Sequence, residues 1–449
     1  MNKKLSFAGI SSALSRNLRV KGRQHQTVMH KGVLMRRLFF ILIFSCCMVL
    51  SLAAQADRIA ASTGAGANLQ NTKVEVVQIG SGSNSVQVLR SSDTETTLQF
   101  NVGEFKKFKV NINSEDWYHI LLSKEGKTLD AGYPELPVFN RSIIIGDNAK
   151  MKLEVYDVRY EDIKLPIAPS KGNLTRDIDP ASVPYSFGDV YQQNEFYPKQ
   201  MATLSDPYIM RDFRGIVVRT NPFAYNPITQ TLRIYTSYKV RVYQDGIDDF
   251  NVLTTTRDEI SRAFVEVYEN HFLNWDSSRY TAVSDNFGRF LIIYYDSFET
   301  AIQPLMQWKR QKGIPGYYIA FSTVGTTATE LQTFIQTYYT SYSVDFVILV
   351  GDAAQIPTLS VDGGGSDPSF ALVAGADNYP DLFISRISAT TAADVTTQVN
   401  KFITYERDFG TNQTWIQWAT GVASEQGPGD DGEYDWQHMD NIRNDLLGY

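Results

Sequence analysis

Two short, uninterrupted apolar runs in the second half of the chain place the strongest constraint on its fold. They are Phe290–Tyr295, with the sequence FLIIYY, and Phe346–Val350, with the sequence FVILV. A strand without alternation of apolar and polar residues is typical of a parallel sheet, because helices cover both faces of such a sheet. The runs therefore predict a buried parallel sheet after Gly288.

Helical patterns separate these runs, as parallel strands require. Apolar residues recur at helical spacing in Ile302–Lys309, Thr327–Tyr338 and Asp394–Asp408. Thr391 and Asp394 have the spacing of a helix capping box. Further strands are expected at Tyr317–Phe321, Leu382–Ile387 and Trp415–Ser424. Strands that alternate with helices predict a mostly parallel, doubly wound α/β domain over residues 281–449.

The pattern in residues 96–245 is different, because short runs there alternate apolar and polar residues. Examples are Thr97–Val102, Met151–Tyr156 and Leu232–Tyr235. Many short alternating strands with turn residues between them predict an antiparallel β-sandwich. His119 falls in such a run and is expected to be packed or exposed rather than to bind a ligand.

The two segments beside the sandwich are expected to be connections. Residues 57–95 are rich in Ser, Gly, Asn and Thr, which indicates a flexible lead-in. Residues 246–280 read as a linker that contains one amphipathic helix over Asp258–Leu273.

The amino-terminal region, residues 1–56, has the features of a secretory signal peptide. Arg36 and Arg37 precede the apolar run Leu38–Ala54, and small residues close it at Ala54-Gln55-Ala56. Met35 is an alternative start. The run is short for a membrane span, so we expect an exported protein that is secreted or held at the cell surface.

Charge and cysteine content exclude several classes of function. Nine of the 42 Lys and Arg residues lie in residues 1–56, which leaves 33 against 49 acidic residues in 57–449, a formal charge of −16. A chain this acidic is not expected to bind nucleic acid. The only cysteines are Cys46 and Cys47, both in the apolar run. Residues 57–449 therefore form no disulfide and supply no thiolate. No phosphate-binding glycine motif, HExxH or GxSxG occurs.

The stretch Gly421–His438, GVASEQGPGDDGEYDWQH, is the most acidic candidate site. Glu425 directly follows a small apolar run, and Asp435 begins an amphipathic segment. Ligands of open α/β sheets bind beyond the carboxyl ends of the strands, so these carboxylates are candidates for chemistry or for binding a cation. The alternative is a solvated acidic loop before a helix.

Several segments resemble the gingipain-type cysteine peptidases. For the catalytic domain they are Val347–Asp352 with Ile356-Pro357, Ser366-Asp367, Asp377–Arg386 and Tyr405-Glu406-Arg407. For the prodomain they are Gly132–Pro137, Ala168–Gly172, Arg211–Gly215 and Pro222–Pro227. The resemblance covers residues 96–449 and implies a β-sandwich prodomain followed by a caspase-like α/β peptidase domain.

The resemblance implies a cysteine endopeptidase zymogen that acts on proteins or peptides, with its own prodomain as an intramolecular inhibitor. It also places the family's catalytic His and Cys beyond the position that matches Tyr449. We therefore expect a truncated fragment that is inactive by itself, and His438 is not assigned as a catalyst. The alternatives are a non-catalytic secreted binding or structural module, and a sortase-like peptidase of the same family.

The resemblance also assigns individual residues. Glu425 matches the carboxylate that orients the catalytic histidine. Asp435 matches the acid at the bottom of the pocket for a basic side chain, which implies cleavage after Arg, with Lys as the second choice. Arg279 and Tyr280 resemble the activation cleavage point, in a polar segment where nicking is favoured.

A calcium site is implied as well. Its ligands would be Asp377 and Asp381 together with the carbonyls of Ala374 and Tyr379, and oxygen ligands on an irregular loop suit that ion. The alternative is an ordinary polar turn, for which Asp377–Pro380 has suitable residues.

Overall fold

The computed structural model describes most of the chain from residue 74 onward. The described residues are 74–79, 82–175, 177–255, 257–276, 283–408, 410, 418–424 and 434–448. The predicted signal peptide, the predicted processing site at Arg279 and Tyr280, and Glu425 lie outside them. No helix within these stretches is long and apolar enough to cross a membrane.

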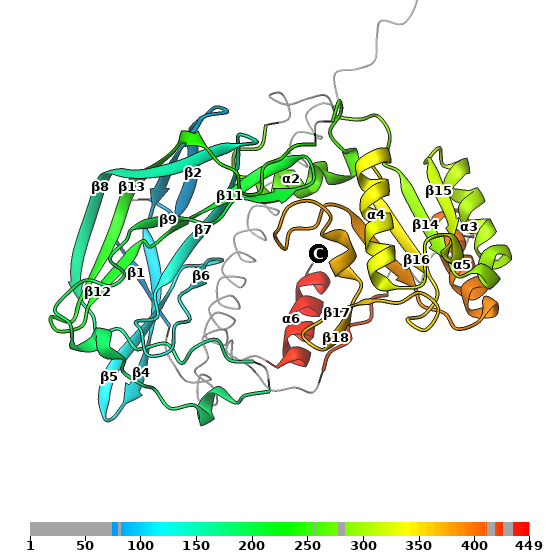
Figure 1. Cartoon of the computed structure of the whole chain (residues 1–449). Helices are drawn as coiled ribbons and strands as arrows, with labels where there is room; N and C mark the ends of the chain where they lie inside the picture. The colour runs from blue at the N-terminus through cyan, green and yellow to red at the C-terminus, as the bar shows by residue number, and fades with distance from the viewer. Residues whose placement is uncertain are drawn as a thin grey trace, which may run out of the picture. The chain divides into compact units, whose positions relative to one another are not determined.

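Antiparallel strands make up the first part of the described chain. They are β1 (Glu75–Gln78), β2 (Ser85–Ser91), β3 (Glu95–Asn101), β4 (Glu104–Ile112), β5 (Glu115–Leu121), β6 (Gly126–Lys127), β7 (Pro137–Ile145), β8 (Ala149–Lys164), β9 (Ala202–Leu204), β10 (Tyr208–Met210), β11 (Phe213–Thr220), β12 (Phe223–Asn226) and β13 (Thr231–Ile247). Two short 3₁₀ helices, η2 (Pro180–Ser182) and η3 (Asp189–Gln192), interrupt them. The sheet orders are β1-β4-β5, β10-β11-β7-β6 and β12-β13-β3-β2, with β9 on β11 and β8 on β13. The predicted antiparallel region is confirmed (Figure 1).

One apolar core holds these sheets together. The strand β13 shows how the sequence pattern builds it, because alternate residues are buried and the residues between them are less so. The buried side chains of β13 are Leu232, Ile234, Tyr238, Val240 and Val242. Since successive side chains of a strand point to opposite faces, one face of β13 enters the core.

The lead-in and linker differ from the prediction. Residues 57–95 were expected to be flexible, but β1 and β2 occupy 75–78 and 85–91 and pair with β4 and β3. The predicted helix over Asp258–Leu273 is shorter, because it consists of the 3₁₀ turn η4 (Arg262–Phe264) and α2 (Val265–His271). The sequences of β1 and β2 are polar and therefore resemble loops. These segments become strands because β4 and β3 supply the backbone partners.

The second part of the described chain has the expected α/β arrangement. Its elements are β14 (Phe290–Tyr294), η5 (Asp296–Phe298), α3 (Glu299–Gln311), β15 (Gly316–Ala320), η6 (Phe321–Thr323), α4 (Ala328–Tyr342), β16 (Phe346–Val350), β17 (Leu359–Val361), β18 (Gly364–Ser366), η7 (Pro368–Ala371), β19 (Phe383–Ile387), α5 (Ala392–Glu406) and α6 (Asp435–Leu447). Strands β15, β14, β16 and β19 form a parallel sheet in that order. The prediction of an α/β domain is confirmed.

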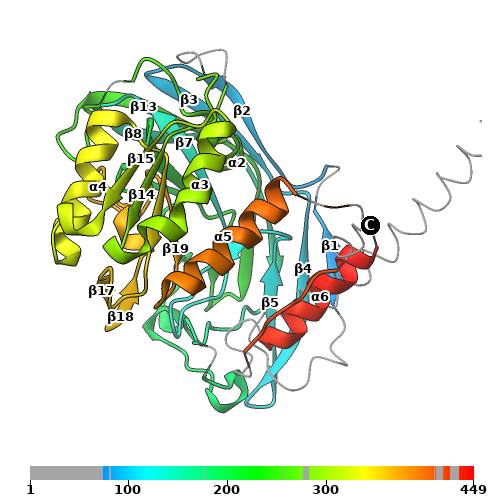
Figure 2. The ribbon, with the colours of Figure 1, turned by 90° about the vertical axis from the view of Figure 1, so that its right-hand side faces the viewer.

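Helices cover both faces of this sheet, which explains the uninterrupted apolar strands. Helices α3 and α5 pack on one face and α4 on the other (Figure 1). Figure 2 shows α3 and α5 side by side. An ion pair joins the two helices, with Lys309 Nζ on α3 2.9 Å from Glu406 Oε1 on α5. The predicted capping box at Thr391 and Asp394 is present at the start of α5.

One expected strand is not found. Residues 415–424 were predicted to be the next strand, but residues 418–424, the part that is described, are not in a strand. The apolar residues there, Trp418 and Val422, are 82% and 85% exposed. Without a neighbouring strand to pair with, an apolar run does not become a strand by its own propensity.

Candidate functional site

The carboxyl ends of β14, β16 and β19 form the edge at which α/β sheets bind ligands. Strand β16 ends at Val350 and is followed by Gly351, whose φ of 144° suits glycine, and by Asp352. The backbone N–H groups of these two residues donate to the carbonyls of Ile387 and Ala389, both at 3.0 Å. The Asp352 carboxylate accepts from Ala353 N at 2.9 Å and Ser388 Oγ at 3.2 Å. Asp352 therefore ties together two chain segments at this edge.

Arg386, on β19, binds the chain segment that follows β16. Its guanidinium contacts both carboxylate oxygens of Asp367 at 2.7 Å and donates to the carbonyls of Gly351 and Ile356, both at 2.9 Å. The hydrogen bonds from Arg386 hold the pKa of Asp367 below its ordinary value. The sequence segments containing both residues supported the resemblance, but this pairing was not predicted, because they lie 19 residues apart on different elements.

Asp435 is the first residue of α6. The helix dipole favours an acidic side chain at this position. Ser424 Oγ donates to Asp435 Oδ2 at 2.5 Å, which connects the start of this helix to the residue before Glu425. His438 lies on the same helix with its side chain exposed. Because Glu425 lies outside the described residues, its predicted role in orienting a histidine stays a prediction.

Asp381, a predicted calcium ligand, is fully buried. One carboxylate oxygen accepts from the backbone N of Arg211 at 2.9 Å. The other accepts from the backbone N of Val373 at 3.0 Å and of Ala374 at 2.7 Å. Burial raises the pKa of Asp381 to about 7, although these three hydrogen bonds act in the opposite direction.

Asp377, the second predicted carboxylate ligand, also accepts backbone hydrogen bonds. Its donors are the backbone N of Ile209 at 2.9 Å, the backbone N of Tyr379 at 2.9 Å and the side-chain amide of Asn251 at 3.2 Å. Burial raises the pKa of Asp377 above its ordinary value. The ring of Tyr379 stacks on that of Tyr208, with centroids 3.7 Å apart.

In this conformation, the carboxylates of Asp377 and Asp381 are arranged to accept hydrogen bonds rather than to bind a cation. Both oxygens of Asp381 and of Asp377 face N–H groups, whose partial positive charge opposes a metal ion at the same positions. Within the described stretches, no three His, Cys, Asp or Glu side chains gather in an arrangement that could hold a metal ion. The donors from Ile209, Arg211 and Asn251 were not predicted, because they lie more than 120 residues away in sequence.

Two family models match the two parts of the chain. Residues 77–282 match Propeptide_C25 and residues 284–448 match Peptidase family C25. Among solved structures, a complex of Porphyromonas gingivalis RgpB pro- and mature domains is 32% identical and covers 42% of this chain and 98% of that chain, with a TM-score of 0.40.

Curated relatives agree with the family models. Gingipain R1 of Porphyromonas gingivalis is 35% identical over 375 residues, which are 81% of this chain and 38% of the relative. Gingipain R2 of the same species is 33% identical over 81% of this chain and 50% of its own length. Lys-gingipain HG66 is 22% identical over 80% of this chain and 22% of its own length. The chain thus spans half or less of the length of these relatives. It belongs to the gingipain-type C25 family of cysteine peptidases, with the family's propeptide followed by part of the peptidase domain.

Proposed function

We propose that these residues belong to a secreted cysteine endopeptidase that is made as a zymogen and cleaves after arginine. The observation that carries this proposal is the difference in sequence identity, 35% and 33% to gingipain R1 and R2 against 22% to Lys-gingipain. Asp435 supports it chemically, since a carboxylate can bind a guanidinium through a bidentate, charge-assisted pair. A solved relative at 33% identity is described as an Arg-specific cysteine proteinase.

The 449 residues by themselves are proposed not to hydrolyse peptides. No cysteine follows Cys47, and His438 is the only histidine after His271. A thiolate nucleophile needs a cysteine with a base within hydrogen-bond reach. The nucleophile would therefore have to come from sequence outside these residues, with Glu425 orienting the catalytic histidine.

The propeptide is proposed to act as an intramolecular inhibitor until it is cut from the peptidase domain after Arg279. Solved structures of relatives include a complex of pro- and mature domains and one concerned with zymogenic latency of gingipain K. Export by the signal peptide would bring the zymogen to the cell surface or beyond it, where protein and peptide substrates are met.

The specificity test uses a longer protein that contains these residues and a complete peptidase domain. Fluorogenic peptides that differ only in Arg, Lys or citrulline before the cleaved bond are compared, because citrulline keeps the shape of arginine without its charge. We expect Arg to be preferred, and Asp435→Asn to lower kcat/KM on Arg by about 100-fold or more while citrulline changes little.

The matched control is Asp440→Asn, an exposed acid on the same helix α6. It should leave the ratio of Arg to citrulline cleavage unchanged. If Asp435→Asn keeps that ratio as well, the arginine pocket is assigned to the wrong residue. A longer protein that cleaves none of the peptides would contradict the proposed activity itself.

A further inference from the structure

Two fully buried arginines lie three residues apart at the β10–β11 turn, and they serve different parts of the chain. Arg214 donates to the carbonyls of Asn251 and Ala149, both at 2.7 Å, and pairs with Asp248 at 2.9 Å. It also donates to the carbonyls of Gly146 at 3.2 Å and Phe250 at 2.9 Å, and all five partners lie within the propeptide match, residues 77–282. Arg214 therefore stabilises the propeptide internally, as a buried arginine commonly does when its donors are satisfied.

Arg211 reaches into the peptidase domain instead. Its Nη1 donates to the carbonyls of Val344 at 3.0 Å and Asp381 at 2.9 Å, and its Nη2 donates to the carbonyl of Ser343 at 3.3 Å. The same Nη2 lies 2.6 Å from a carboxylate oxygen of Asp345. The Arg211 side chain is 1% exposed and the Asp345 side chain 5%, so the pair is shielded from water.

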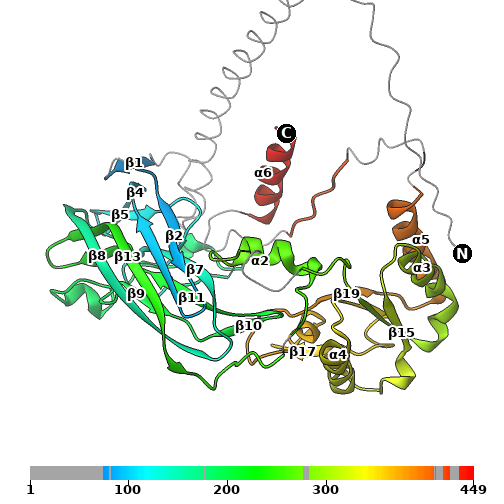
Figure 3. The same cartoon turned by 90° about the horizontal axis from the view of Figure 1, so that it is seen from above.

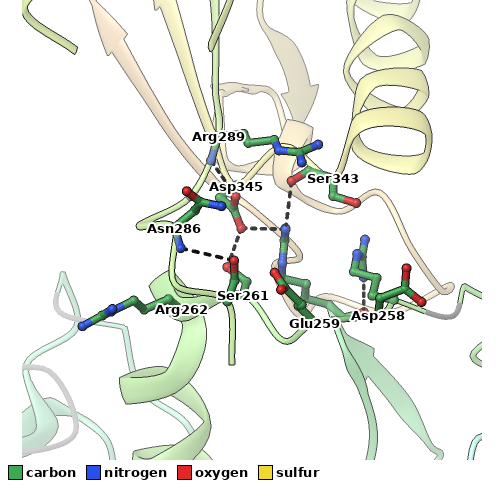
Figure 4. A pocket seen from close by; sticks show the side chains of 12 residues that line it. Asp258, Glu259, Ser261, Arg262, Asn286, Arg289, Ser343 and Asp345 are labelled. Carbon is green, nitrogen blue, oxygen red and sulfur yellow. Dashed lines mark hydrogen bonds and ion pairs between the residues drawn. The ribbon is translucent and has the colours of Figure 1, made fainter. Parts of the chain in front are cut away.

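The acceptors of this site are held in place by their own domain and by the linker. The second oxygen of Asp345 accepts from the backbone N of Arg289 at 2.7 Å, and Ser261 Oγ also donates to this carboxylate. The backbone carbonyl of Asp345 accepts from Phe383 N at 2.8 Å. Figure 4 shows Asp345 between Ser261 and the backbone of Arg289, with Ser343 close by. A carboxylate held in this way is pre-organised to receive a planar cation.

Aromatic rings add to the preference for a guanidinium. The Arg211 guanidinium carbon lies 5.0 Å from the ring centroid of Phe264 and 5.5 Å from that of Tyr339. Rings within about 6 Å attract a cation through their negative faces. A lysine ammonium at this place could not reach three carbonyls and a carboxylate in one plane.

The site lies at the amino ends of the parallel strands, the opposite edge of the sheet from their carboxyl ends. Ser343–Asp345 directly precede β16, Asp381 lies just before β19, and Arg289 directly precedes β14. These are the amino ends of three parallel strands, whereas Asp352 follows the carboxyl end of β16. Figure 3 shows β10, which leads into Arg211, on the side of the antiparallel part that faces the α/β part.

We propose that the amino edge of the peptidase sheet carries a binding site for one guanidinium group, and that Arg211 in this site keeps the propeptide bound after the connection to the peptidase domain is cut. Asp345 supplies the charge, and the carbonyls of Ser343, Val344 and Asp381 supply the remaining acceptors. The site is separate from the carboxyl edge, so attachment of the propeptide does not require it to occupy the substrate pocket. The role in maturation rests on the proposed function, while the guanidinium site does not.

The test uses the whole 449-residue chain with a recognition sequence for a site-specific protease placed in residues 277–282. After cleavage, the dissociation constant of the two pieces is measured by sedimentation over a dilution series. The wild-type pieces should stay together. Arg211→Ala should weaken their association at least 100-fold, and Arg211→Lys and Asp345→Asn should weaken it measurably.

The control is Arg214→Ala, which removes an equally buried arginine whose partners are all in the propeptide. It should lower the melting temperature of the propeptide without releasing it. Circular dichroism of the separated propeptide from Arg211→Ala shows whether that piece keeps its β structure. Equal release by both variants, or tight binding by Arg211→Ala, would overturn the proposal.

Chemical rescue distinguishes a guanidinium site from a general loss of packing. Guanidinium chloride at millimolar concentration should partly restore association of the Arg211→Ala pieces, and ammonium chloride at the same concentration should not. Equal effects of the two salts would contradict the site. Because the engineered cut does not use Arg279 and no peptidase activity is read, failure here is distinguishable from failure of the proposed enzyme function.

Discussion

At the scale of single residues, Glu406 on α5 is an acid whose ionised form stabilises the fold. It accepts from Lys309 Nζ at 2.9 Å, from Lys312 Nζ at 2.9 Å and from Trp308 Nε1 at 2.8 Å, all on or next to α3. Partial burial alone would raise its pKa, but these hydrogen bonds lower the pKa to about 2. The ionised carboxylate therefore connects two helices on the same face of the sheet.

The lowered pKa predicts a dependence of stability on pH. A carboxyl whose folded pKa lies below its unfolded value contributes stability above about pH 4.5, and this contribution is lost as the pH falls toward 2. With a discount for partial exposure, we expect Glu406→Gln to cost about 1–2 kcal/mol at pH 6. The difference in melting temperature between the variant and the wild type should shrink as the pH is lowered from 6 to 3, because the contribution of the ionised carboxylate falls over this range.

The exposed acid Glu299 at the start of α3 provides the comparison for Glu406. Glu299→Gln should leave the pH profile of the melting temperature close to that of the wild type. A constant difference between Glu406→Gln and the wild type at every pH would show that packing, rather than charge, is responsible.

Glu425 gives the second prediction at this scale. A carboxylate that accepts from an imidazole fixes the tautomer and stabilises the imidazolium that pairs with a thiolate. In a longer protein with a complete peptidase domain, Glu425→Gln should lower kcat by about 100-fold or more with little change in melting temperature. The nearby acid Glu433, changed to Gln, should have little effect, and unaltered turnover in Glu425→Gln would remove that residue from the catalytic site.

At the scale of elements, the loop 374–381 is where the calcium prediction and the structure give different expectations. The resemblance implies that calcium binds there, whereas the structure has N–H donors on the carboxylates of Asp377 and Asp381. If calcium binds, it should raise the melting temperature of the whole chain, and the double change Asp377→Ala with Asp381→Ala should abolish the increase. Identical melting curves with calcium and with a chelator would contradict calcium binding.

Other elements follow from local rules. Helices α4 and α5 both begin with a capping box, at Thr327 with Glu330 and at Thr391 with Asp394. Each box satisfies N–H groups that the first turn of a helix leaves unpaired. The boundaries of these helices are set by residues close in sequence, and this is why α5 was predicted within a few residues.

At the scale of the whole molecule, the proposed cut between propeptide and peptidase domain would change its state. The predicted position is after Arg279, between the matches to Propeptide_C25 and Peptidase family C25. Amino-terminal sequencing of the secreted, mature form should show Tyr280 as the first residue. Arg279→Gln should block this cut, and the control Arg262→Gln, in the 3₁₀ turn η4, should not. A mature form beginning elsewhere would contradict the assignment.

Much of this architecture could be predicted from the sequence, since it depends on patterns of neighbouring residues. The apolar runs FLIIYY and FVILV indicated strands covered on both faces, and the alternation in Leu232–Tyr235 indicated a strand with one buried face. The order of strands and helices then limited the possible topologies. The content of Cys and His likewise limited which chemistry these residues can perform.

The tertiary structure decided which distant residues meet. Arg211 and Arg214 belong to one short motif, yet one contacts the peptidase domain and the other the propeptide, and nothing in the motif distinguishes them. The same holds for Asp377 and Asp381, whose oxygens accept hydrogen bonds from residues more than 120 positions away. Local sequence sets backbone preferences and burial, but partners of buried charges depend on how separate elements pack.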